Sequence, residues 1–487
     1  MRKRRYHRRH ALHVAPSPWK RRLWVILALV IVGVGILGML LWNSWGRIEE
    51  EPSYRSEHAI QRVTLTSGVD FSHERRISWR CGDSVCSAEV LVSRIGERGD
   101  TLRPKRLQPT HEVVTTSGGQ AVYYRVQLDS LQPGVRYVYR LRVAGAKDYR
   151  GAFVLPDEER RTSFFYLGDL RDNPTELTRR LFDYLRSSPL PSDFYALSGG
   201  ILSGQTDRAW QDFYHSLDGV SSSVPMILAP GLGEAQRSGW SHILDGRWRA
   251  QLGYPMNGSE SLSLAHYYID FPLFRLVILD TTDLLGLGAI NSTRSWLSSV
   301  LHEAKQPWRI VLCHHAVDRV EEGKKNLIMH YFIKDELIEA GADLVLQGND
   351  HSYARGALRS RQGDTIPPLF VVSSASVRHH RNSFNPCYDR LGSGLLLYQH
   401  ITVEPDKLTY ASYRFPKDRT ESLEKCRYDS VVLRRAVGDS VRLEDLAHTW
   451  PERFAYDAFS HDSRGRKKAA QYAKEVRDRA SHRASKK

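Results

Sequence analysis

Residues 344–355 read LVLQGNDHSYAR, an apolar run that ends at a glycine and is followed by polar residues. The run at 344–347 predicts a short buried strand that stops before Gly348. Open α/β sheets place their chemistry just beyond the carboxyl ends of their strands. Asn349, Asp350 and His351 occupy that position, so this stretch indicates an α/β fold with a polar site at a strand end.

The same alternation extends over residues 162–436. Apolar strand-like runs alternate with stretches of helical spacing, which predicts α/β layers. The expected strands are residues 163–168, 193–198, 224–229, 273–280, 308–313 and 342–347. The expected helices are residues 175–188, 207–217, 293–304 and 333–341. Polar residues also follow three other strands, at Asp169, at residues 231–234, and at His314 and His315.

Residues 59–156 have a different pattern. Short runs such as RRISWR and AVYYRVQL alternate polar and apolar residues and are separated by turn residues, including LQPG at 131–134. Several short strands with regular turns predict an antiparallel β-sandwich of about 100 residues. Trp79 and Tyr137 are its expected core aromatics.

The net charge of +15 is concentrated at the two ends of the chain. The first 22 residues contribute +9 and residues 464–487 contribute +8, so the residues between them carry a net charge of −2. A nearly neutral body predicts no specific nucleic-acid binding. Residues 437–487 are interpreted as a C-terminal extension with a basic, solvated tail, since charge-rich ends are usually disordered.

Residues 23–42, from Leu23 to Trp42, are twenty residues without a charge. About 20 apolar residues cross the hydrocarbon core of a membrane. Trp24, Trp42 and Trp45 lie where interfacial aromatics are expected, and the basic tail at 1–22 precedes the segment. The positive-inside rule then predicts a single-pass anchor with a cytoplasmic N-terminus and a periplasmic or extracellular body. A cleaved signal peptide is the alternative.

The chain has five cysteines. An oxidising compartment makes a Cys81–Cys86 bridge and a Cys387–Cys426 bridge plausible, which leaves Cys313 in an apolar strand. Sequence alone does not assign the pairing, and five free thiols are the alternative.

Several phrases resemble the calcineurin-like metallophosphoesterases, closest to the purple acid phosphatases, over about residues 59–435. Those proteins carry a fibronectin type III-like domain ahead of the catalytic domain. Residues 75–80 and 126–141 resemble the small domain, and residues 208–231, 265–283 and 293–301 resemble parts of the catalytic one. The resemblance implies a metallophosphoesterase αββα sandwich at 162–436, preceded by the β-sandwich and the membrane helix.

The resemblance also assigns metal-ligand positions, and three of them keep their residue. Asp169 matches the first motif, His314 the fourth and His351 the last. The remaining assigned positions are substituted. The substituted residues are Gly200, where a bridging Asp is expected, Ser203 for a Tyr ligand, Leu232 for Asn, Gly233 for an assisting His, and Asn349 for a His.

These substitutions weaken the case for two-metal chemistry. Two cations about 3.5–4 Å apart need shared ligands between them, and glycine and leucine offer none. The resemblance leaves open one Fe, Zn or Mn ion held by Asp169, His314, His351 and Asn349, or no metal. Arg171 is a candidate for a permanent cation in place of metal charge. Without the resemblance, Asp169 is equally well read as a helix cap and His314 as a hydrogen-bonded core residue.

Two classes of function follow. One is an anchored phosphoesterase that hydrolyses phosphate esters at a rebuilt metal site. The other is an inactive or weakly active member of the fold that serves as a binding or scaffolding module for a partner. The number of substituted ligands favours the second.

Overall fold

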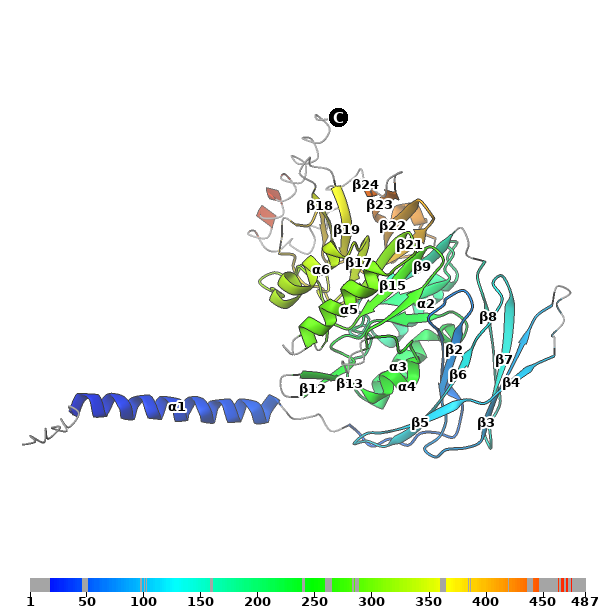
Figure 1. Cartoon of the computed structure of the whole chain (residues 1–487), viewed down its shortest axis with the longest axis horizontal. Helices are drawn as coiled ribbons and strands as arrows, with labels where there is room; N and C mark the ends of the chain where they lie inside the picture. Colours follow the sequence, from blue (N-terminus) through cyan, green and yellow to red (C-terminus); the bar gives the residue numbers. More distant parts are fainter. Residues whose placement is uncertain are drawn as a thin grey trace, which may run out of the picture. The chain divides into compact units, whose positions relative to one another are not determined.

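The computed structural model describes residues 18–45, 51–96, 99, 101, 103–157, 161–238, 241–258, 265–282, 284, 289–359, 365–383, 385, 387–418, 420–435 and 441–445, with a few more between 463 and 474. The chain forms two compact units, residues 1–49 with 237–239, and the rest. The first contains α1 (Pro18–Trp45), which includes the whole predicted membrane segment (Figure 1). The basic residues 1–17 lie outside the described part.

Helix α1 exposes apolar side chains, including Trp24 at 70% and Ile31 at 63%. Its side chains are described without interruption over residues 22–36. Within the described part of the chain, no helix meets the length and hydropathy expected of a membrane span. The predicted anchor therefore stays a prediction.

The second unit begins with a sandwich of two antiparallel four-stranded sheets. One sheet has the order β1 (Gln61–Ser67), β2 (Arg75–Arg80), β6 (Gln120–Leu128), β5 (Thr110–Thr115). The other has the order β4 (Lys105–Leu107), β3 (Ala88–Arg94), β7 (Arg136–Val143), β8 (Tyr149–Val154). Trp79 and Tyr137 lie in the core between them, as the alternating pattern predicts.

Two mixed seven-stranded sheets follow. The first has the order β11 (Met226–Leu228), β10 (Phe194–Leu197), β9 (Thr162–Leu167), β21 (Leu397–Val403), β22 (Lys407–Arg414), β23 (Arg427–Arg435), β24 (Val441–Asp445). The second has the order β14 (Tyr267–Asp270), β15 (Phe274–Leu279), β16 (Trp308–Cys313), β17 (Leu344–Gln347), β19 (Thr365–Val372), β18 (Tyr353–Arg359), β20 (Arg390–Gly392). Strands β9 to β11 are parallel to one another, as are β15, β16, β17 and β19.

Alternation along each strand explains the layers. On β9, Phe164 and Tyr166 pack against residues of the second sheet, whereas Phe165 and Leu167 pack against the helices of the first. Helices α2 (Thr175–Arg186) and α3 (Asp207–Leu217) cover the first sheet, and α5 (Ile290–His302) and α6 (Lys334–Glu339) cover the second (Figure 1). Because both faces of each strand are buried, the strands read as continuous apolar runs. The predicted mixed α/β fold is confirmed.

Some element bounds differ from the sequence-based expectation. The predicted helix at 333–341 is preceded by a π-helical turn, η3 (Met329–Ile333). Strand β24 extends the first sheet into the predicted C-terminal extension. The remaining elements are η1 (Val220–Ser222), β12 (Ala235–Ser238), β13 (Ser241–Leu244), α4 (Gly246–Leu252) and α7 (Leu423–Cys426). The predicted domain bounds stay a prediction, since residues 50–236 and 240–487 form one compact unit.

The predicted disulfides are not formed, since all five cysteines are free thiols. Cys387 lies beside Asp318, whereas Cys426 packs in the layer of α2 and α3, so they do not face each other. Cys81 packs in the core of the β-sandwich with Cys86 against it.

Buried charges join the β-sandwich to the α/β layers. Asp207 accepts ion pairs from Arg62 at 2.8 Å and Arg80 at 2.7 Å, and Arg247 binds Glu51 at 2.5 Å. Asp245 is a second partner of Arg247, at 2.6 Å. We call these six residues the junction cluster.

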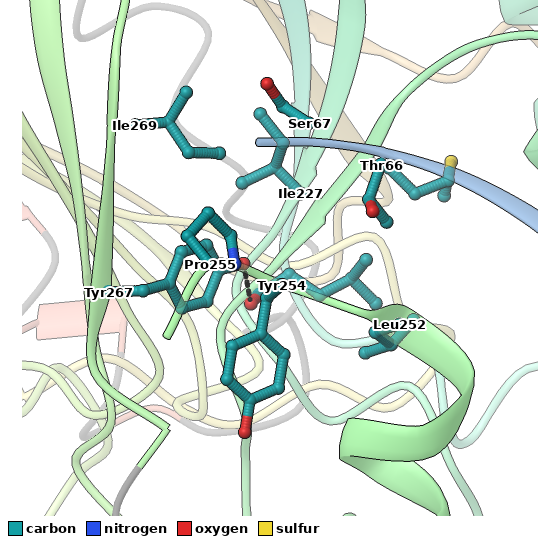
Figure 2. Close-up of a pocket in the computed structure, with 10 residues that line it drawn as sticks. Thr66, Ser67, Ile227, Leu252, Tyr254, Pro255, Tyr267 and Ile269 are labelled. Atoms are coloured by element: carbon teal, nitrogen blue, oxygen red, sulfur yellow. Dashed lines mark hydrogen bonds between the residues drawn. The ribbon is translucent and has the colours of Figure 1, made fainter. Parts of the chain in front are cut away.

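A small cavity of about 10 Å³ lies in the same region, between β1, β11 and β14. Figure 2 shows Thr66 and Ser67 at its wall opposite Tyr254 and Tyr267. The Tyr267 hydroxyl donates to the Leu228 carbonyl at 2.8 Å, drawn as the dashed line. Its size is close to that of one buried water, so this cavity is a packing feature and not a substrate pocket.

Candidate functional site

The carboxyl ends of the parallel strands in both sheets converge on one site. The Tyr166 hydroxyl donates to the Gln347 carbonyl at 2.6 Å, and this bond links β9 to β17. The Gly348 amide donates to the His314 carbonyl at 2.9 Å, which joins the ends of β16 and β17. The spacing of the polar strand ends therefore correctly predicts a shared site.

Asp169 and His314 form the inner pair of the site. Asp169 Oδ1 lies 4.0 Å from His314 Nδ1, and both side chains are almost fully buried. Asp169 Oδ2 accepts the Asn349 amide at 2.9 Å. Burial, followed by the neighbouring Asp350, raises the pKa of Asp169 well above its usual value. The cap position of α2 is Pro174, so Asp169 does not cap that helix.

His314 is held in one tautomer. Its Nδ1 lies 2.8 Å from the Ser198 carbonyl, which can only accept, so Nδ1 carries the proton and Nε2 keeps a lone pair. Burial lowers the pKa of His314 to about 4. His315 turns away from the inner pair and bonds Thr281 at 2.8 Å. A fixed Nε2 lone pair is the state that a metal-binding histidine adopts.

The substituted positions have closed around the inner pair. Gly200 has φ +63°, and a Cβ there would lie 2.7 Å from Asp169 Oδ1. A Cβ at Gly233 would lie 2.5 Å from the Leu202 carbonyl. A His at 233 needs a backbone shift, whereas an Asp at 200 would clash with the Asp169 side chain and would have to adopt a positive φ that L-residues rarely take. Leu232 is partly buried, and Ser203 is exposed.

Glu234 is buried but has no free oxygen to offer. Its carboxylate accepts four backbone N–H groups, from Gly200, Ile201, Leu202 and Gly231, at 2.7–2.9 Å. Burial raises its pKa, and these hydrogen bonds oppose the rise. Glu234 therefore fixes the loops after β10 and β11 and is a structural residue.

Asn349 contributes its backbone to the site and directs its side chain elsewhere. Its Nδ2 lies 3.3 Å from Asp350 Oδ1, and the Asp350 carboxylate is bound by the Arg319 guanidinium at 2.5 Å. Burial raises the pKa of Asp350 to about 6. The Asn349 side-chain carboxamide is therefore directed to Asp350, and only the backbone N–H of Asn349 contacts Asp169.

His351 lies in a second group, which we call the outer cluster: Arg171, Asp172, His351, Arg378 and His380. Asp172 Oδ2 is 3.7 Å from both Arg171 Nε and His351 Nε2, and Asp172 Oδ1 is 3.9 Å from Arg378 Nη1. The rings of His351 and His380 meet edge to face at 5.0 Å. Burial, then His380 and Arg171, lower the pKa of His351 to about 3.

Backbone strain gathers at the same strand ends. Asp169, Asn349 and His351 have φ values of 40°, 70° and 46°. Such conformations cost about 1–3 kcal/mol each and cluster at functional sites. Two of these strained positions carry the assigned ligand residues Asp169 and His351, and the third carries Asn349.

Comparison with known proteins identifies this architecture. No protein-family model matches the sequence. Over 175 residues the chain is 23% identical to purple acid phosphatase 17 from Arabidopsis thaliana, covering 32% of this chain and 46% of that protein. The purple acid phosphatase PPD1 from yellow lupin seeds, Lupinus luteus, aligns with a TM-score of 0.61 at 16% identity, over 78% of this chain and 75% of that chain. The chain therefore has the fold of the purple acid phosphatases.

A second solved structure supports the same fold. PhoD aligns with a TM-score of 0.56 at 11% identity, over 87% of this chain and 99% of that chain. The predicted family resemblance is confirmed at the level of the fold. The chain spans less than half of the curated relative that it matches, and activity does not follow from these likenesses.

The residues of this purple acid phosphatase-like site do not fit two metal ions. Two cations need a bridging carboxylate and further oxygen or nitrogen ligands. Gly200, Leu232 and Gly233 supply none. Among the residues that the structure describes, no three His, Cys, Asp or Glu side chains are arranged to hold a metal ion. Asp169 and His314 approach each other, whereas His351 belongs to the outer cluster.

Sequence reasoning missed three members of the outer cluster, Asp172, Arg378 and His380. A usable signal exists in RHHR at residues 378–381, where two histidines stand between two arginines. That segment meets the strand ends because the Asn173 carboxamide accepts the Val377 amide at 2.8 Å. Neither the family motifs nor the strand pattern points to this pairing.

Proposed function

We propose that this chain uses a purple acid phosphatase-like fold for binding rather than for two-metal hydrolysis, in a body held outside the cytoplasm by its N-terminal helix. The observation that carries the proposal is the closure of the ligand positions. A Cβ at Gly233 would clash with the Leu202 backbone carbonyl, and a Cβ at Gly200 would clash with the Asp169 carboxylate at a positive φ, so both missing groups are disfavoured in the present structure. A phosphate ester or a protein partner is the expected ligand class.

The state of the inner pair supports this proposal. An Asp with a raised pKa is poorly stabilised as an anion, because burial penalises the charge and its one hydrogen bond in the described structure comes from the Asn349 backbone N–H. In a two-metal site the same carboxylate would be held ionised by the cations. In the metal-free site the Asp169 carboxyl is therefore uncompensated, which agrees with the binding proposal and would be reversed by a bound cation.

A single-metal phosphoesterase is the second candidate. The observation in its favour is the His314 tautomer, which leaves the Nε2 lone pair available as a ligand on a ring whose Nδ1 lies 4.0 Å from Asp169. Such a site, with Fe, Zn or Mn, would activate water and polarise a phosphate ester. It would have fewer side-chain ligands than the three that catalytic metal sites usually have.

Metal content and turnover test both candidates. The purified full chain is analysed for bound metals and assayed with p-nitrophenyl phosphate, alongside Asp169→Ala and His314→Ala. The binding proposal expects no stoichiometric metal and no hydrolysis that depends on Asp169. One metal per chain, lost in both variants together with turnover, would establish the single-metal enzyme. About two metals per chain would contradict both candidates.

The membrane part of the proposal is supported by α1. Its exposed apolar side chains suit lipid, and the basic residues before it suit a cytoplasmic N-terminus. The full chain is expected to stay in the membrane fraction after a high-pH wash, and a variant lacking residues 1–45 to leave it. In intact cells, external protease should reach the body but not an N-terminal tag. A soluble full chain would contradict the anchor.

A further inference from the structure

The outer cluster brings two guanidinium groups and an imidazole around one carboxylate without forming a hydrogen bond to it. The separations of 3.7, 3.7 and 3.9 Å exceed hydrogen-bond length. Asp172 Oδ2 is buried and has no hydrogen-bond partner in the described part of the chain. His351 Nδ1 is likewise buried and unpartnered there, with its side chain 3% exposed.

We propose that Arg171, Arg378 and His351 form a metal-independent site for a phosphate-type oxyanion, and that the Asp172 carboxylate occupies this place in the free protein. The inference rests on the proposed function, in which the fold binds rather than hydrolyses. It names the chemical class of the ligand and an internal competitor for it.

Arg171 lies beside two of the substituted positions. Its backbone N–H donates to the Gly200 carbonyl at 2.8 Å, so the residue is fixed beside the missing bridging position. Its Cδ lies 3.7 Å from where a Cβ at Gly233 would be. The backbone of Arg171 is therefore held beside position 200 and its side chain passes position 233, so a permanent cation lies next to two substituted positions.

Arg378 supplies the second cation from a different loop. Its side chain is 51% exposed and that of Arg171 is 32% exposed, so both can meet a ligand from solvent. Guanidinium groups match the oxygens of phosphate in fork-like pairs, and such charge-assisted bonds are about twice as strong as neutral ones. Within the described part of the chain, each arginine has one ion-pair contact, and in both cases it is the long contact with Asp172.

His351 provides a neutral donor between them. One nitrogen of a neutral imidazole carries a proton and can donate it to an anion. Its Nε2 faces Asp172 at 3.7 Å, and its Nδ1 has no partner in the described structure. A ligand oxygen nearer than Asp172 would accept the proton of Nε2, whose present contact with Asp172 is too long for a hydrogen bond.

Asp172 fits the role of an internal competitor because its carboxylate is too short to reach the three groups. It carries the charge that an oxyanion would carry, but its oxygens stop short of each donor. A phosphate has more oxygens and no tether, so it can approach the guanidinium groups more closely. Ligand binding then requires the Asp172 carboxylate to turn away.

The test measures phosphate and phenyl phosphate binding to the full chain in detergent by calorimetry, with excess chelator present. Arg171→Gln should weaken binding roughly tenfold or more, since a charged hydrogen bond is lost. Asp172→Asn should tighten binding several-fold, because it removes the competing charge. Arg186→Gln is the matched control, an exposed arginine on α2 that pairs with Asp183 at 3.0 Å and should leave binding unchanged.

The opposite signs of the two variants separate a binding site from a structural role. A general disruption of the loop would weaken binding in both variants. Tighter binding in Asp172→Asn with loss in Arg171→Gln supports the proposal, and unchanged or weaker binding in Asp172→Asn overturns it. Unchanged binding in Arg171→Gln overturns it as well.

The chelator separates this inference from the proposed function. If no phosphate binds and no metal or turnover is found, the oxyanion site is wrong and the binding proposal stands. If phenyl phosphate binds only after about two equivalents of metal are added and is then hydrolysed to phenol and phosphate, both are wrong.

Discussion

The junction cluster and the outer cluster both group opposite charges, but the charges of the junction cluster are buried and close together, whereas those of the outer cluster are partly exposed and further apart. In the junction cluster the ion pairs of Asp207 and Arg247 are 2.5–2.8 Å long. In the outer cluster the contacts of Asp172 are 3.7–3.9 Å long, and polar atoms of Asp172 and His351 have no partner in the described structure. Short, saturated pairs hold parts of the fold together, whereas loose contacts leave bonding capacity for a ligand.

The same contrast separates Glu234 from Asp169. Both carboxylates are fully buried and lie at the same strand ends, but Glu234 accepts four N–H groups and Asp169 accepts one. Glu234 therefore stabilises the loops, and Asp169 carries an uncompensated cost. Buried polar groups without partners are unusual enough in native proteins to indicate function.

The largest expected effect is the loss of the charge in the junction cluster. Asp207→Asn leaves Arg62 and Arg80 buried without their counter-ion, which should lower the free energy of unfolding by about 3–5 kcal/mol. Urea denaturation followed by tryptophan fluorescence measures it, since Trp210 and Trp248 are buried nearby. Asp212→Asn, on the same helix but paired with exposed Arg208 at 3.0 Å, is the control and should change little. Equal effects in the two variants would contradict the distinction.

Asp169→Asn should have the opposite sign. The pKa of Asp169 is raised well above 3.8, mainly by burial, so its charge destabilises the folded protein above that pH. Without metal, the neutral variant should be more stable at pH 7 by about 1–3 kcal/mol. The gain should fade as the pH falls towards 3.8, because Asp169 then becomes protonated in the unfolded chain as well as in the folded protein. Urea midpoints at the two pH values, in chelator, measure it.

A loss of stability in Asp169→Asn would mean that the carboxylate is held by a positive charge that the protein retains. Because the measurement is made in chelator, that charge would belong to the protein itself, with Arg171 as the neighbouring cation, and not to a bound metal. That outcome would also remove the difference drawn above between Asp169 and Glu234.

The sequence predicts the layers well because they depend on local pattern. Each strand with two buried faces reads as an apolar run, and the run on β9 divides residue by residue between the two sides of its sheet. Asp169 and His314 were predicted to be neighbours because both follow parallel strands, and the carboxyl ends of these strands meet. Rules of this kind need only the spacing along the chain.

The outer cluster could not be predicted in the same way. Arg378 and His380 lie on a loop after β19. Hydrogen bonds between residues far apart in the sequence hold this loop, such as the one from the Ser383 N–H to the Val320 carbonyl. The role of Glu234 depends equally on four backbone groups from two loops. Such contacts are set by backbone geometry, and no residue pattern encodes them directly.

His266 isolates the effect of burial from that of neighbouring charge. Its Nδ1 accepts the Asp280 amide at 2.9 Å and its Nε2 bonds Thr293 at 3.1 Å, so the neutral ring is satisfied. Burial alone lowers its pKa to about 3. The unfolded chain binds a proton at His266 near pH 6.5, whereas the folded protein does not. The contribution of neutral His266 to the free energy of unfolding is therefore complete above pH 6.5 and is lost as the pH falls towards 3.

The expected measurement is a slope. Between pH 6 and pH 4, wild-type stability should fall faster than that of His266→Gln, by up to about 1.4 kcal/mol for each pH unit. Urea denaturation across this range gives the two slopes. Parallel curves would show that the ring is protonated inside the fold, and would weaken the use of burial to explain Asp169.

The smallest effect is expected at an exposed pair with the same length as a junction pair. Arg179 meets Glu176 at 2.7 Å on α2, which equals the Arg80–Asp207 distance, but the side chains are 35% and 65% exposed. Water already solvates these charges, and the pair gains little over the unfolded chain. Arg179→Ala should leave the urea midpoint unchanged within error, helped by the high helix propensity of alanine. A loss as large as that of Asp207→Asn would mean that contact distance, and not burial, sets the value of an ion pair here. The long contacts of the outer cluster would then show only that its ion pairs are weak. They would no longer indicate that its charged groups are available to a ligand.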